Sequence, residues 1–434
     1  MRAPVAPLTG ALAGAIGPPL HRHRPVRRWA HNAPMRADPS LPVLRLALVL
    51  SLGAAVSLGV TRFAYGLLLP PMRSDLGWSF TLAGAMNTAN AAGYLLGALL
   101  TPWLLRRVTP PRLMLAGAVM ASLFMAASGF FTDATALLVQ RALAGLASAL
   151  VFIAGGLLAA RLGALQPHRS GFLLGLYYGG TGLGIVASAL LVPPVLAAAA
   201  AAGQPHGWAW AWWGLAGLCG LSTAALAWPA RRLAGLQAPA PAGTDRSPPR
   251  HWRAADFWPG LTGYLAFGVG YIGYMTFVIA LLREQGASGG FVTLFYTLLG
   301  VAVVASSRLW AGWLDRHRDG QPLARLNALL GGAALVPALT AQPWALLASG
   351  VVFGAVFLSV VASTTALVRH NLPPAQWAAG IAAFTTVFAA GQIVGPTVVG
   401  LIADGPGGLA RGLVFSAVVL WLGAAVALRQ RALG

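Results

Sequence analysis

The chain has 434 residues, of which 57% are hydrophobic and only 9% are charged. Soluble domains carry about 25% charged residues, so the composition excludes a soluble enzyme, a disordered protein and a disulfide scaffold. A mean hydropathy of +0.72 favours an all-α polytopic membrane protein. The net charge of +20 comes from 29 basic residues, all of them arginine, against nine acids.

Twelve apolar runs of roughly 20 residues are long enough to cross a bilayer as helices. They cover 46–69, 81–105, 113–131, 134–159, 170–197, 208–229, 257–282, 290–311, 323–341, 344–368, 376–402 and 408–428. The stretch 1–42 is basic and proline-rich, and we expect a disordered cytoplasmic tail there. The stretch 231–256 has the composition of a cytoplasmic linker. It separates an N-terminal six-helix bundle over 43–230 from a C-terminal one over 257–434.

The arginines between the runs predict the orientation of the helices. With the N-terminus inside, 24 arginines fall in cytoplasmic segments or at the cytoplasmic ends of runs, whereas Arg73, Arg283 and Arg411 fall outside. This is the positive-inside pattern, and it predicts that the N- and C-termini are both cytoplasmic. Basic residues that are all arginine are typical of high-GC bacteria, so we expect a bacterial inner (plasma) membrane protein.

Four tryptophans open the sixth run at its outer end, namely Trp208, Trp210, Trp212 and Trp213. Tryptophan is enriched where a helix meets the membrane surface. We therefore expect these four side chains to anchor the sixth helix at the interface, with stacking on a ligand as the alternative.

An internal repeat relates the two predicted bundles. Matching residues recur in the same order at offsets of 209 to 211: Gly59, Tyr65 and Gly77 with Gly268, Tyr274 and Gly286; Trp103 with Trp313; Gly180 and Gly184 with Gly391 and Gly395. Both copies begin on the cytoplasmic side, so the repeats are parallel. Parallel six-helix repeats predict two halves related by a pseudo-two-fold axis along the membrane normal.

Motifs in both halves carry a resemblance to a known family. They read Gly59-Val60-Thr61-Arg62-Phe63-Ala64-Tyr65, Asn90-Ala91-Ala92-Gly93-Tyr94, Tyr178-Gly179-Gly180-Thr181-Gly182, Phe267-Gly268-Val269-Gly270-Tyr271, Gly354-Ala355-Val356-Phe357 and Gly391-Gln392-Ile393-Val394-Gly395-Pro396. Over about 45–428 the sequence resembles the major facilitator superfamily, and within it the YbfB/YjiJ-type transporters. The resemblance implies twelve transmembrane helices in two bundles, and a permease that works by alternating access.

One signature of the superfamily, the loop Gly-x-x-x-Asp-Arg-x-Gly-Arg, is reduced here. The loop after the second run has no acid, and only the loop after the eighth run keeps the pair Asp315-Arg316. In the family such a loop latches neighbouring helices in one conformational state. The resemblance therefore implies that only Asp315 and Arg316 form this latch through an acid.

Two arginines lie inside predicted spans, where an ionised side chain costs about 2.5–3.5 kcal/mol at the helix centre. Arg62 lies about 12 Å from the outer end of the first span. It either contacts an anionic solute in a central cavity or is satisfied by helix carbonyls and by neighbours such as Asn87 or Asn90. Arg141 begins an Arg-x-x-x-Gly block that resembles the fourth-span signature of the superfamily. The resemblance implies a role in conformational cycling or proton coupling, and a buried structural arginine is the alternative.

Polar and aromatic side chains complete a candidate substrate site, with hydrogen bonding between helices as their alternative role. Its residues are Arg62, Tyr65, Asn87, Asn90, Tyr94, Tyr178, Tyr271, Tyr274 and Gln392. A second set is expected to support conformational change, through buried charge, the loop pair, small-x-x-x-small packing and a helix bend. These residues are Arg141, Asp315, Arg316, Gly180, Gly184, Gly391, Gly395 and Pro396.

The acids inside the predicted bundles lie in loops or at the edges of spans, and no histidine lies in a span core. We therefore expect no buried carboxylate relay, and unpaired arginines favour an anionic substrate. The alternatives are an exporter of drugs or metabolites and a non-transporting membrane sensor.

The sequence lacks the equipment of a membrane enzyme, such as a histidine-rich metal cluster or a phosphate-binding loop with lysine. We expect no catalytic residue, metal or cofactor. The expected partners are a small-molecule substrate and the lipid bilayer but no nucleic acid, with proton coupling left open and a monomeric carrier.

Overall fold

A computed structural model describes residues 42–235, 253–373 and 376–433, and every regular element in these ranges is a helix. Residues from Pro42 onward form one compact unit. The predicted tail up to Leu41 and most of the predicted linker lie outside the described residues.

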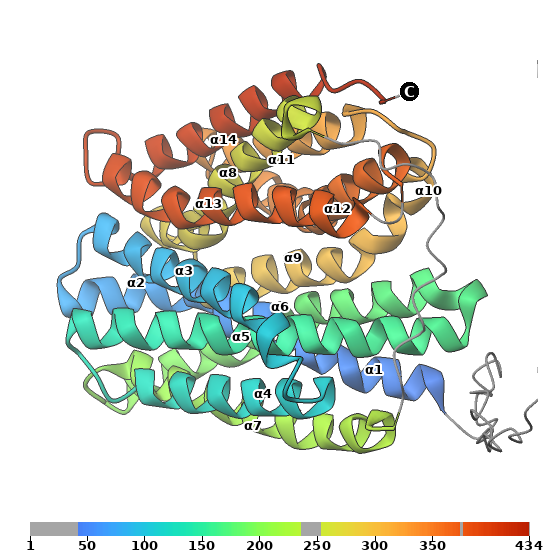
Figure 1. Cartoon of the computed structure of the whole chain (residues 1–434). Helices are drawn as coiled ribbons and strands as arrows, with labels where there is room; N and C mark the ends of the chain where they lie inside the picture. Colours follow the sequence, from blue (N-terminus) through green and yellow to red (C-terminus); the bar gives the residue numbers. More distant parts are fainter. Residues whose placement is uncertain (1–41, 236–252, 374–375, 434) are drawn as a thin grey trace, which may run out of the picture. The chain divides into compact units, whose positions relative to one another are not determined.

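Six membrane-length helical segments form the N-terminal half (Figure 1). The first segment is continuous through α1 (Val43–Ala54), the π-helix η1 (Ala55–Phe63) and α2 (Tyr65–Leu76); the others are α3 (Phe80–Leu104), α4 (Pro110–Ser128), α5 (Ala134–Leu165), α6 (Ser170–Ala201) and α7 (Gly207–Leu233). A short 3₁₀ turn, η2 (Pro167–Arg169), joins α5 to α6.

Six more segments form the C-terminal half, after the 3₁₀ turn η3 (Ala254–Phe257). They are α8 (Trp258–Glu284), α9 (Gly289–Leu309), α11 (Gln321–Leu339), α12 (Pro343–Asn371), α13 (Trp377–Ala403) and α14 (Gly408–Ala427), with the single-turn α10 (Ala311–Leu314) after α9. Ten helices in the described ranges are both long and apolar enough to span a membrane. The other two, α3 and α7, have 25 and 27 residues and are less apolar. Each of the twelve segments overlaps one of the twelve predicted runs, although some extend beyond it, such as the first segment and α5.

The internal repeat is visible in the turns that precede α3 and α9. Gly77 and Gly286 both have a positive φ, of 65° and 85°, which glycine adopts without steric cost. Two residues later, Ser79 and Ser288 cap α3 and α9 by accepting a backbone hydrogen bond, at 3.1 and 3.2 Å. The offset of 209 therefore joins residues with the same local structure.

Glycine contacts hold equivalent helices together in the two halves. In the N-terminal half η1 meets α6 where Gly59 faces Gly184, and a Cβ on either residue would overlap the other. In the C-terminal half α8 meets α13 where Gly268 faces Gly391, and added Cβ atoms there would be as crowded. Small residues allow the two backbones to approach closely, so both halves join the same two helices through glycines, although Gly184 corresponds in the repeat to Gly395 and not to Gly391.

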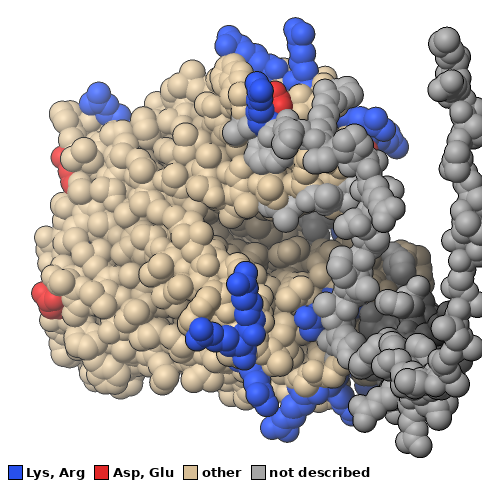
Figure 2. Space-filling view, in the orientation of Figure 1, with Lys and Arg blue, Asp and Glu red and all other residues tan. Residues whose placement is uncertain are grey.

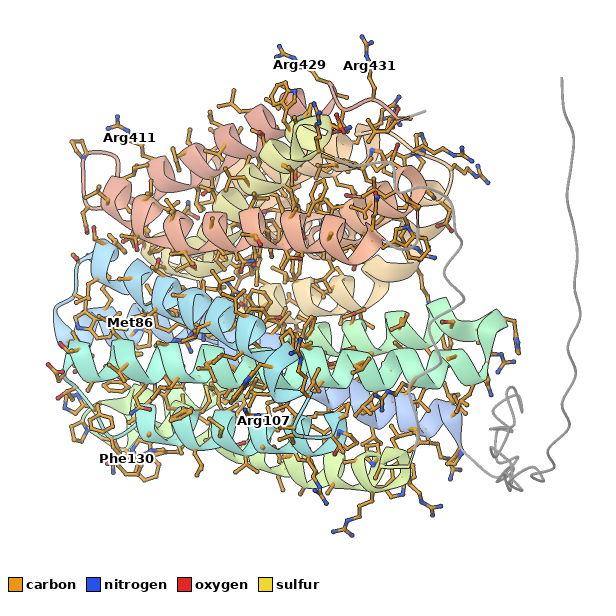
Figure 3. All side chains as sticks on the ribbon, in the orientation of Figure 1. Met86, Arg107, Phe130, Arg411, Arg429 and Arg431 are labelled. Carbon is orange, nitrogen blue, oxygen red and sulfur yellow. The ribbon has the colours of Figure 1, made fainter. Side chains whose placement is uncertain are left out.

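The two ends of the bundle differ in charge, and the arginines are concentrated at one of them (Figures 2 and 3). The arginine-rich end carries Arg45, Arg106, Arg107, Arg112, Arg161, Arg169, Arg231, Arg232, Arg253, Arg308, Arg316, Arg318, Arg325, Arg369, Arg429 and Arg431. The opposite, arginine-poor end carries Arg73, Arg283 and Arg411. The grouping is the one that the predicted runs imply.

The two halves are joined along α6 and α9 and along one end of α3 and α13. Gly182 of α6 approaches Gly300 of α9 so closely that neither has room for a Cβ. At the arginine-poor end, the first residues of α3 contact the last residues of α13. Farther along α3, Leu99 is 68% exposed and Trp103 is 48% exposed. Figure 2 shows a hollow between the halves toward the arginine-rich end. The halves are therefore closed against each other at the arginine-poor end and separate toward the other.

Candidate functional site

Side chains from both halves meet at the same depth in the bundle. Each lies thirteen to fifteen residues from the arginine-poor end of its helical segment, about 20 Å at ~1.5 Å per residue. They are Arg62 of η1, Tyr94 of α3, Tyr271 of α8, Phe357 of α12 and Phe388 of α13. Because 20 Å is also about half the length of these segments, the group lies near the middle of the bundle.

Arg62 is the cation of this central group. Its side chain is only 3% exposed, and its Nε and Nη2 atoms are buried without a hydrogen-bond partner. The guanidinium carbon lies 5.9 Å from the ring centre of Tyr94. The one ion pair in the described ranges joins Asp75 to His206, so Arg62 has no carboxylate partner among the described residues.

Arg141 of α5 is equally buried, and unlike Arg62 it has hydrogen-bond partners, although its Nε atom has none. Its Nη1 donates to the Thr61 carbonyl at 2.7 Å, and its Nη2 donates to Asn87 Oδ1 at 3.1 Å. The guanidinium also lies over the rings of Tyr65 and Trp212, at 5.0 and 5.6 Å. Arg141 therefore ties α5 to the first helical segment, α3 and α7, as a structural arginine would.

The amides expected as alternative partners of Arg62 serve Arg141 instead. Asn87 accepts from the Arg141 side chain, and Asn90 Nδ2 donates to the Arg141 carbonyl at 3.1 Å. The Asn90 Oδ1 atom is buried without a partner. Asn87 Nδ2 also donates to Thr276 Oγ1 of α8 at 2.8 Å, so this amide links the two halves.

Three tyrosines predicted for the site lie near Arg62 or near one another. Tyr94 interacts electrostatically with Arg62 and with the hydroxyls of Tyr178 and Tyr271, and Tyr271 also interacts with Arg62. Tyr178 of α6 is 39% exposed, and its ring packs against Tyr177. The structure thus brings together Arg62, Tyr94, Tyr178 and Tyr271 from both halves.

The other predicted tyrosines have their hydroxyls occupied by neighbouring helices. Tyr65 donates to the Ala83 carbonyl at 2.8 Å. The Tyr274 hydroxyl lies 2.8 Å from Ser349 Oγ, and its ring stacks on Phe353 at 4.0 Å. These contacts fasten helices within one half each, at a distance from the shared centre.

Tyr271 belongs to an aromatic layer in the C-terminal half, whose phenylalanines were not among the predicted site residues. The Tyr271 ring is nearly parallel to those of Phe267, Phe388 and Phe357, with centroid separations of 4.7, 5.6 and 6.0 Å. The signal was present in the sequence, because spacings of four on α8 and α13 place aromatic residues on one helix face. Gln392, predicted for the site, lies four residues beyond Phe388 and is 5% exposed.

Apart from Arg141, the residues expected to support conformational change lie either at close contacts between helices or in the loop that follows α10. The predicted glycines are at close helix contacts: a Cβ at Gly180 would overlap the Ser51 carbonyl, and one at Gly395 would crowd the Val269 carbonyl. Pro396 lies inside α13, and its carbonyl is where Gly84 of α3 crosses from the other half. Close helix packing therefore occurs at these positions.

The loop pair Asp315 and Arg316 is exposed, and in the described part of the chain neither side chain forms an ion pair or a hydrogen bond. The loop is instead fastened to the end of α12 by backbone carbonyls. Asn371 Nδ2 donates to the Arg318 carbonyl at 2.8 Å, and His370 Nδ1 lies 2.9 Å from the His317 carbonyl. An ionic latch through Asp315 is not formed in this conformation.

Asp404 closes the arginine-poor end by capping a helix of the other half. Its carboxylate accepts from the backbone N–H groups of Phe80 and Thr81 at 2.7 and 2.8 Å, and from the Thr81 hydroxyl at 2.6 Å. Desolvation opposes ionisation, but these hydrogen bonds and the charge of Arg73 hold the pKa of Asp404 below its usual range. A second cross-contact runs from Thr88 Oγ1 to the Ile393 carbonyl, at 2.6 Å.

The tryptophans of α7 correct one expectation. Trp208 and Trp212 are 2% and 1% exposed, so the prediction that they anchor the helix at the membrane surface is wrong for both. Trp208 Nε1 donates to Asp75 Oδ2 at 2.6 Å, and Trp212 lies under Arg141. Trp210 is 47% exposed and remains available for an interfacial role. The buried pair packs α7 against the first helical segment and α5.

Comparison with known proteins identifies the family. The family described as "Uncharacterised MFS-type transporter YbfB" matches residues 54–428. The chain belongs to this major facilitator family. No curated protein matches the sequence.

Solved structures of transporters share the fold of this facilitator. An inward-facing, unoccupied bacterial homolog of the human lysosomal transporter Spinster superposes with a TM-score of 0.67 and 14% identity, over 90% of this chain and 97% of the other. The nucleoside transporter NupG gives 0.65 and 11%, over 90% and 100%. At these identities the likeness concerns the fold: an all-α, polytopic membrane protein with two six-helix bundles.

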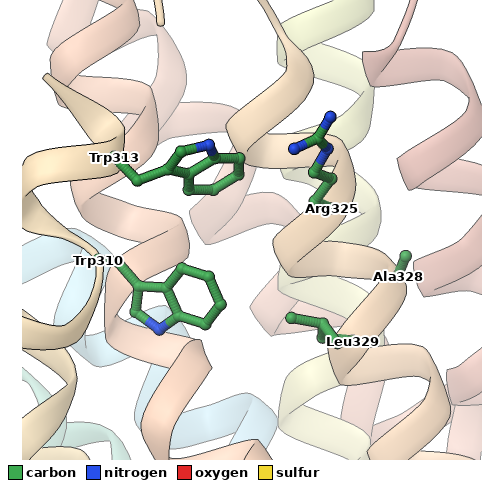
Figure 4. A pocket seen from close by; sticks show the side chains of 5 residues that line it. All are labelled: Trp310, Trp313, Arg325, Ala328 and Leu329. Atoms are coloured by element: carbon green, nitrogen blue, oxygen red, sulfur yellow. The ribbon is translucent and has the colours of Figure 1, made fainter. Parts of the chain in front are cut away.

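The facilitator has a second concave feature, separate from its centre. A pocket of about 580 Å³ lies at the arginine-rich end of the C-terminal half, between the α9–α10 turn and α11 (Figure 4). Trp310, Trp313, Arg325, Ala328 and Leu329 line it. In the described ranges no three His, Cys, Asp or Glu side chains lie close enough to hold a metal ion. Cys219 is buried in α7 as a free thiol.

Proposed function

We propose that this facilitator is a secondary active transporter that carries a small organic anion across a bacterial inner membrane by alternating access. Both termini would lie in the cytoplasm, as the arginine distribution predicts. The protein would act as a carrier and not as an enzyme. One observation supports the choice of an anion above all others: the unpaired guanidinium of Arg62 at the centre of the bundle.

A buried charge without a partner is unfavourable by several kcal/mol, because water has been removed from it and nothing replaces that water. Arg141 satisfies its charge with a carbonyl, an amide and two aromatic rings. Arg62 has Tyr94 at 5.9 Å and a second cation as its charged neighbour. A carboxylate on a bound solute would supply the missing partner. Substrate binding would then relieve an unfavourable state of the empty carrier.

The conformation fits a carrier caught in one of two states. The halves are closed at the arginine-poor end through Asp404 and through Asn87, and a hollow lies toward the arginine-rich end. With that end cytoplasmic, the state is inward-facing, as in the Spinster homolog of similar fold. The outward state would separate α3 from α13 and close the hollow. The glycine contacts within each half let the helices of that half move together.

Export of a cationic drug is the alternative for this fold. The two central cations and the absence of a carboxylate near them in the described helices oppose a permanently positive substrate. A coupled proton would have to travel with the substrate or use an acid at a helix end, since the described acids lie at helix termini or in loops. Proton-coupled uptake of a protonatable organic acid is compatible with both constraints.

Solute-driven proton flux into proteoliposomes with a trapped pH-sensitive dye tests this proposal. A panel of organic acids and a panel of cationic drugs are applied to the wild type, to Arg62→Gln and to Arg62→Lys. Arg112→Gln is the matched control, because Arg112 is exposed at the arginine-rich end. Binding of the same acids is followed in parallel by calorimetry, which detects a substrate even when its transport moves no protons.

We expect at least one acid to bind, with the affinity lost in Arg62→Gln, partly kept in Arg62→Lys and unchanged in Arg112→Gln. Where protons move with the acid, flux follows the same order. Drug-driven flux that persists in Arg62→Gln would identify an exporter in which Arg62 is structural. A failure of every acid to bind would also count against the proposal.

A further inference from the structure

Resting on the proposed function, we propose that the transported anion is an aromatic carboxylate. The carboxylate would pair with Arg62 of the N-terminal half, and its planar ring would lie against the aromatic layer of the C-terminal half.

The aromatic layer consists of side chains from three helices with nearly parallel rings. Phe267 and Tyr271 of α8, Phe388 of α13 and Phe357 of α12 have interplanar angles of 8° to 20° with Tyr271 or with one another. Tyr264, one helical turn from Phe267, extends the layer toward the arginine-rich end by stacking on Phe388 at 4.8 Å. Aromatic pairs in protein cores often meet edge to face. A run of parallel planes therefore gives this wall one common orientation.

The layer lies within reach of the cation. Tyr271 interacts electrostatically with Arg62, and the Phe63 ring, next to Arg62 in the chain, meets Phe357 edge-on at 5.8 Å. Tyr264 of the layer and Tyr94 of the opposite half are also near enough to interact electrostatically. In the proposed complex a rigid acid such as benzoate or naphthoate would direct its charge toward Arg62 and its ring toward the layer.

The two sides select different parts of the ligand. Arg62 requires a negative charge, and its planar guanidinium matches a carboxylate in two-point hydrogen bonding. The parallel rings favour a flat π-system, which stacks on them with its plane aligned. A saturated ring of the same size has the same charge and similar apolar area but puckers away from the layer. We expect an aromatic acid to bind about tenfold more tightly than its saturated counterpart.

Calorimetric titration of the full chain in nanodiscs tests this preference with two matched pairs of probes. The pairs are benzoate with cyclohexanecarboxylate, and 2-naphthoate with decahydronaphthalene-2-carboxylate. Tyr271→Leu and Phe388→Leu each remove one ring of the layer. Phe415→Leu removes an aromatic side chain of the same half that lies on α14, outside the layer. Arg62→Gln removes the cation.

The expected result is a tenfold preference for the aromatic acid in the wild type and in Phe415→Leu. In Tyr271→Leu and in Phe388→Leu the preference falls to twofold or less, because the aromatic acid loses affinity while the saturated acid does not. The wild-type comparison requires no substitution, so a variant that fails to fold does not block the test.

Two further outcomes separate this inference from the function on which it rests. If both acids of a pair bind equally and both depend on Arg62, the carrier transports anions but the aromatic preference is wrong. If no acid of either kind binds, or if binding is unchanged in Arg62→Gln, the anion assignment itself fails and the aromatic preference fails with it.

Discussion

Arg62 and Tyr271 occupy the same position of the internal repeat, 209 residues apart, and they face the same central region from opposite halves. The N-terminal half places a cation there, beside the Tyr94 ring and with no hydrogen-bond partner for its Nε and Nη2 atoms. The C-terminal half places an aromatic ring there, among phenylalanines. Two halves with the same fold thus contribute different chemical groups to the centre, a cation from one half and aromatic rings from the other.

The frame itself is the same in both halves. Ser79 and Ser288 cap equivalent helices, and the glycine pairs Gly59–Gly184 and Gly268–Gly391 hold equivalent helices together. Even the contacts across the interface correspond. Asn87 of α3 reaches Thr276 in the other half, and Tyr296, 209 residues after Asn87, donates to the Phe63 carbonyl at 2.7 Å. The matching helix packing lets the two halves move as similar rigid bodies. To bind one asymmetric solute, however, the two halves must contribute different side chains to the central group.

The largest expected effect separates the two buried arginines of the N-terminal half. Arg141→Gln loses two charge-assisted hydrogen bonds, to Thr61 and to Asn87, and we expect unfolding to become easier by roughly 3 kcal/mol. Arg62→Gln removes a buried charge with no hydrogen bond, so we expect a stability equal to or above that of the wild type. Thermal unfolding of both variants in the same detergent measures the difference.

A matched substrate titration sharpens this comparison. The more stable variant, Arg62→Gln, should be the one that has lost binding, which is the usual relation between stability and function at a strained site. An Arg62→Gln protein that melts as early as Arg141→Gln would show that Arg62 also has a structural role.

A smaller effect is expected at the closure between the halves. Asp404→Asn removes the charge that caps α3, and a helix cap is worth about 1 kcal/mol. The open state at the arginine-poor end should then gain about fivefold in population. Distance measurements between spin labels on α3 and α13 detect the change. Asp133→Asn is the control, since Asp133 caps α5 within one half by accepting from Ala136; an equal shift in both variants would contradict the cross-half role.

The pH dependence of this closure follows from the lowered pKa of Asp404 in the closed state. A carboxyl with a lowered pKa contributes its full stabilisation above its ordinary pKa of about 3.9, and it loses that stabilisation as the pH falls through the lowered value. The contribution of Asp404 to closure should therefore be constant from pH 5 to 8. A difference between wild type and Asp404→Asn that varied with pH across that range would contradict the assignment.

The smallest expected effect concerns the repeat partners Tyr65 and Tyr274. Each hydroxyl makes one hydrogen bond between helices, to Ala83 in one half and to Ser349 in the other. Hydrogen bonds inside membrane proteins are worth about 0.6 kcal/mol on average. Tyr65→Phe and Tyr274→Phe should each lower the stability by about that amount, as measured by unfolding in denaturant, with substrate affinity unchanged. A loss of affinity in either variant would return that tyrosine to the binding site.

The frame was predictable from the sequence because it depends on local patterns. Apolar runs of membrane length, glycines at fixed offsets and the repeat of Gly77 at Gly286 gave the helices and their pairing. The surroundings of each buried arginine were not predictable, since the hydrogen bonds that satisfy Arg141 and leave Arg62 unpaired come from residues up to 80 positions away. The burial of Trp208 has a similar cause, because its partner Asp75 lies 133 residues earlier. The aromatic layer required knowing which faces of α8, α12 and α13 converge.

Because of the π-helix η1, equivalent side chains in the two copies of the repeat face different helices although the residues are the same. Gly59 and Tyr65 are separated by the same six positions as Gly268 and Tyr274, but only the first interval runs through a π-helical turn. A π-helix is wider than an α-helix, so it turns less per residue. Tyr65 accordingly faces α3, whereas Tyr274 faces α12, a helix whose counterpart in the first half is α5. A change in the helical winding of one stretch of backbone alters the direction of the side chains beyond it. A duplicated half can therefore acquire new neighbours while its sequence motif stays intact.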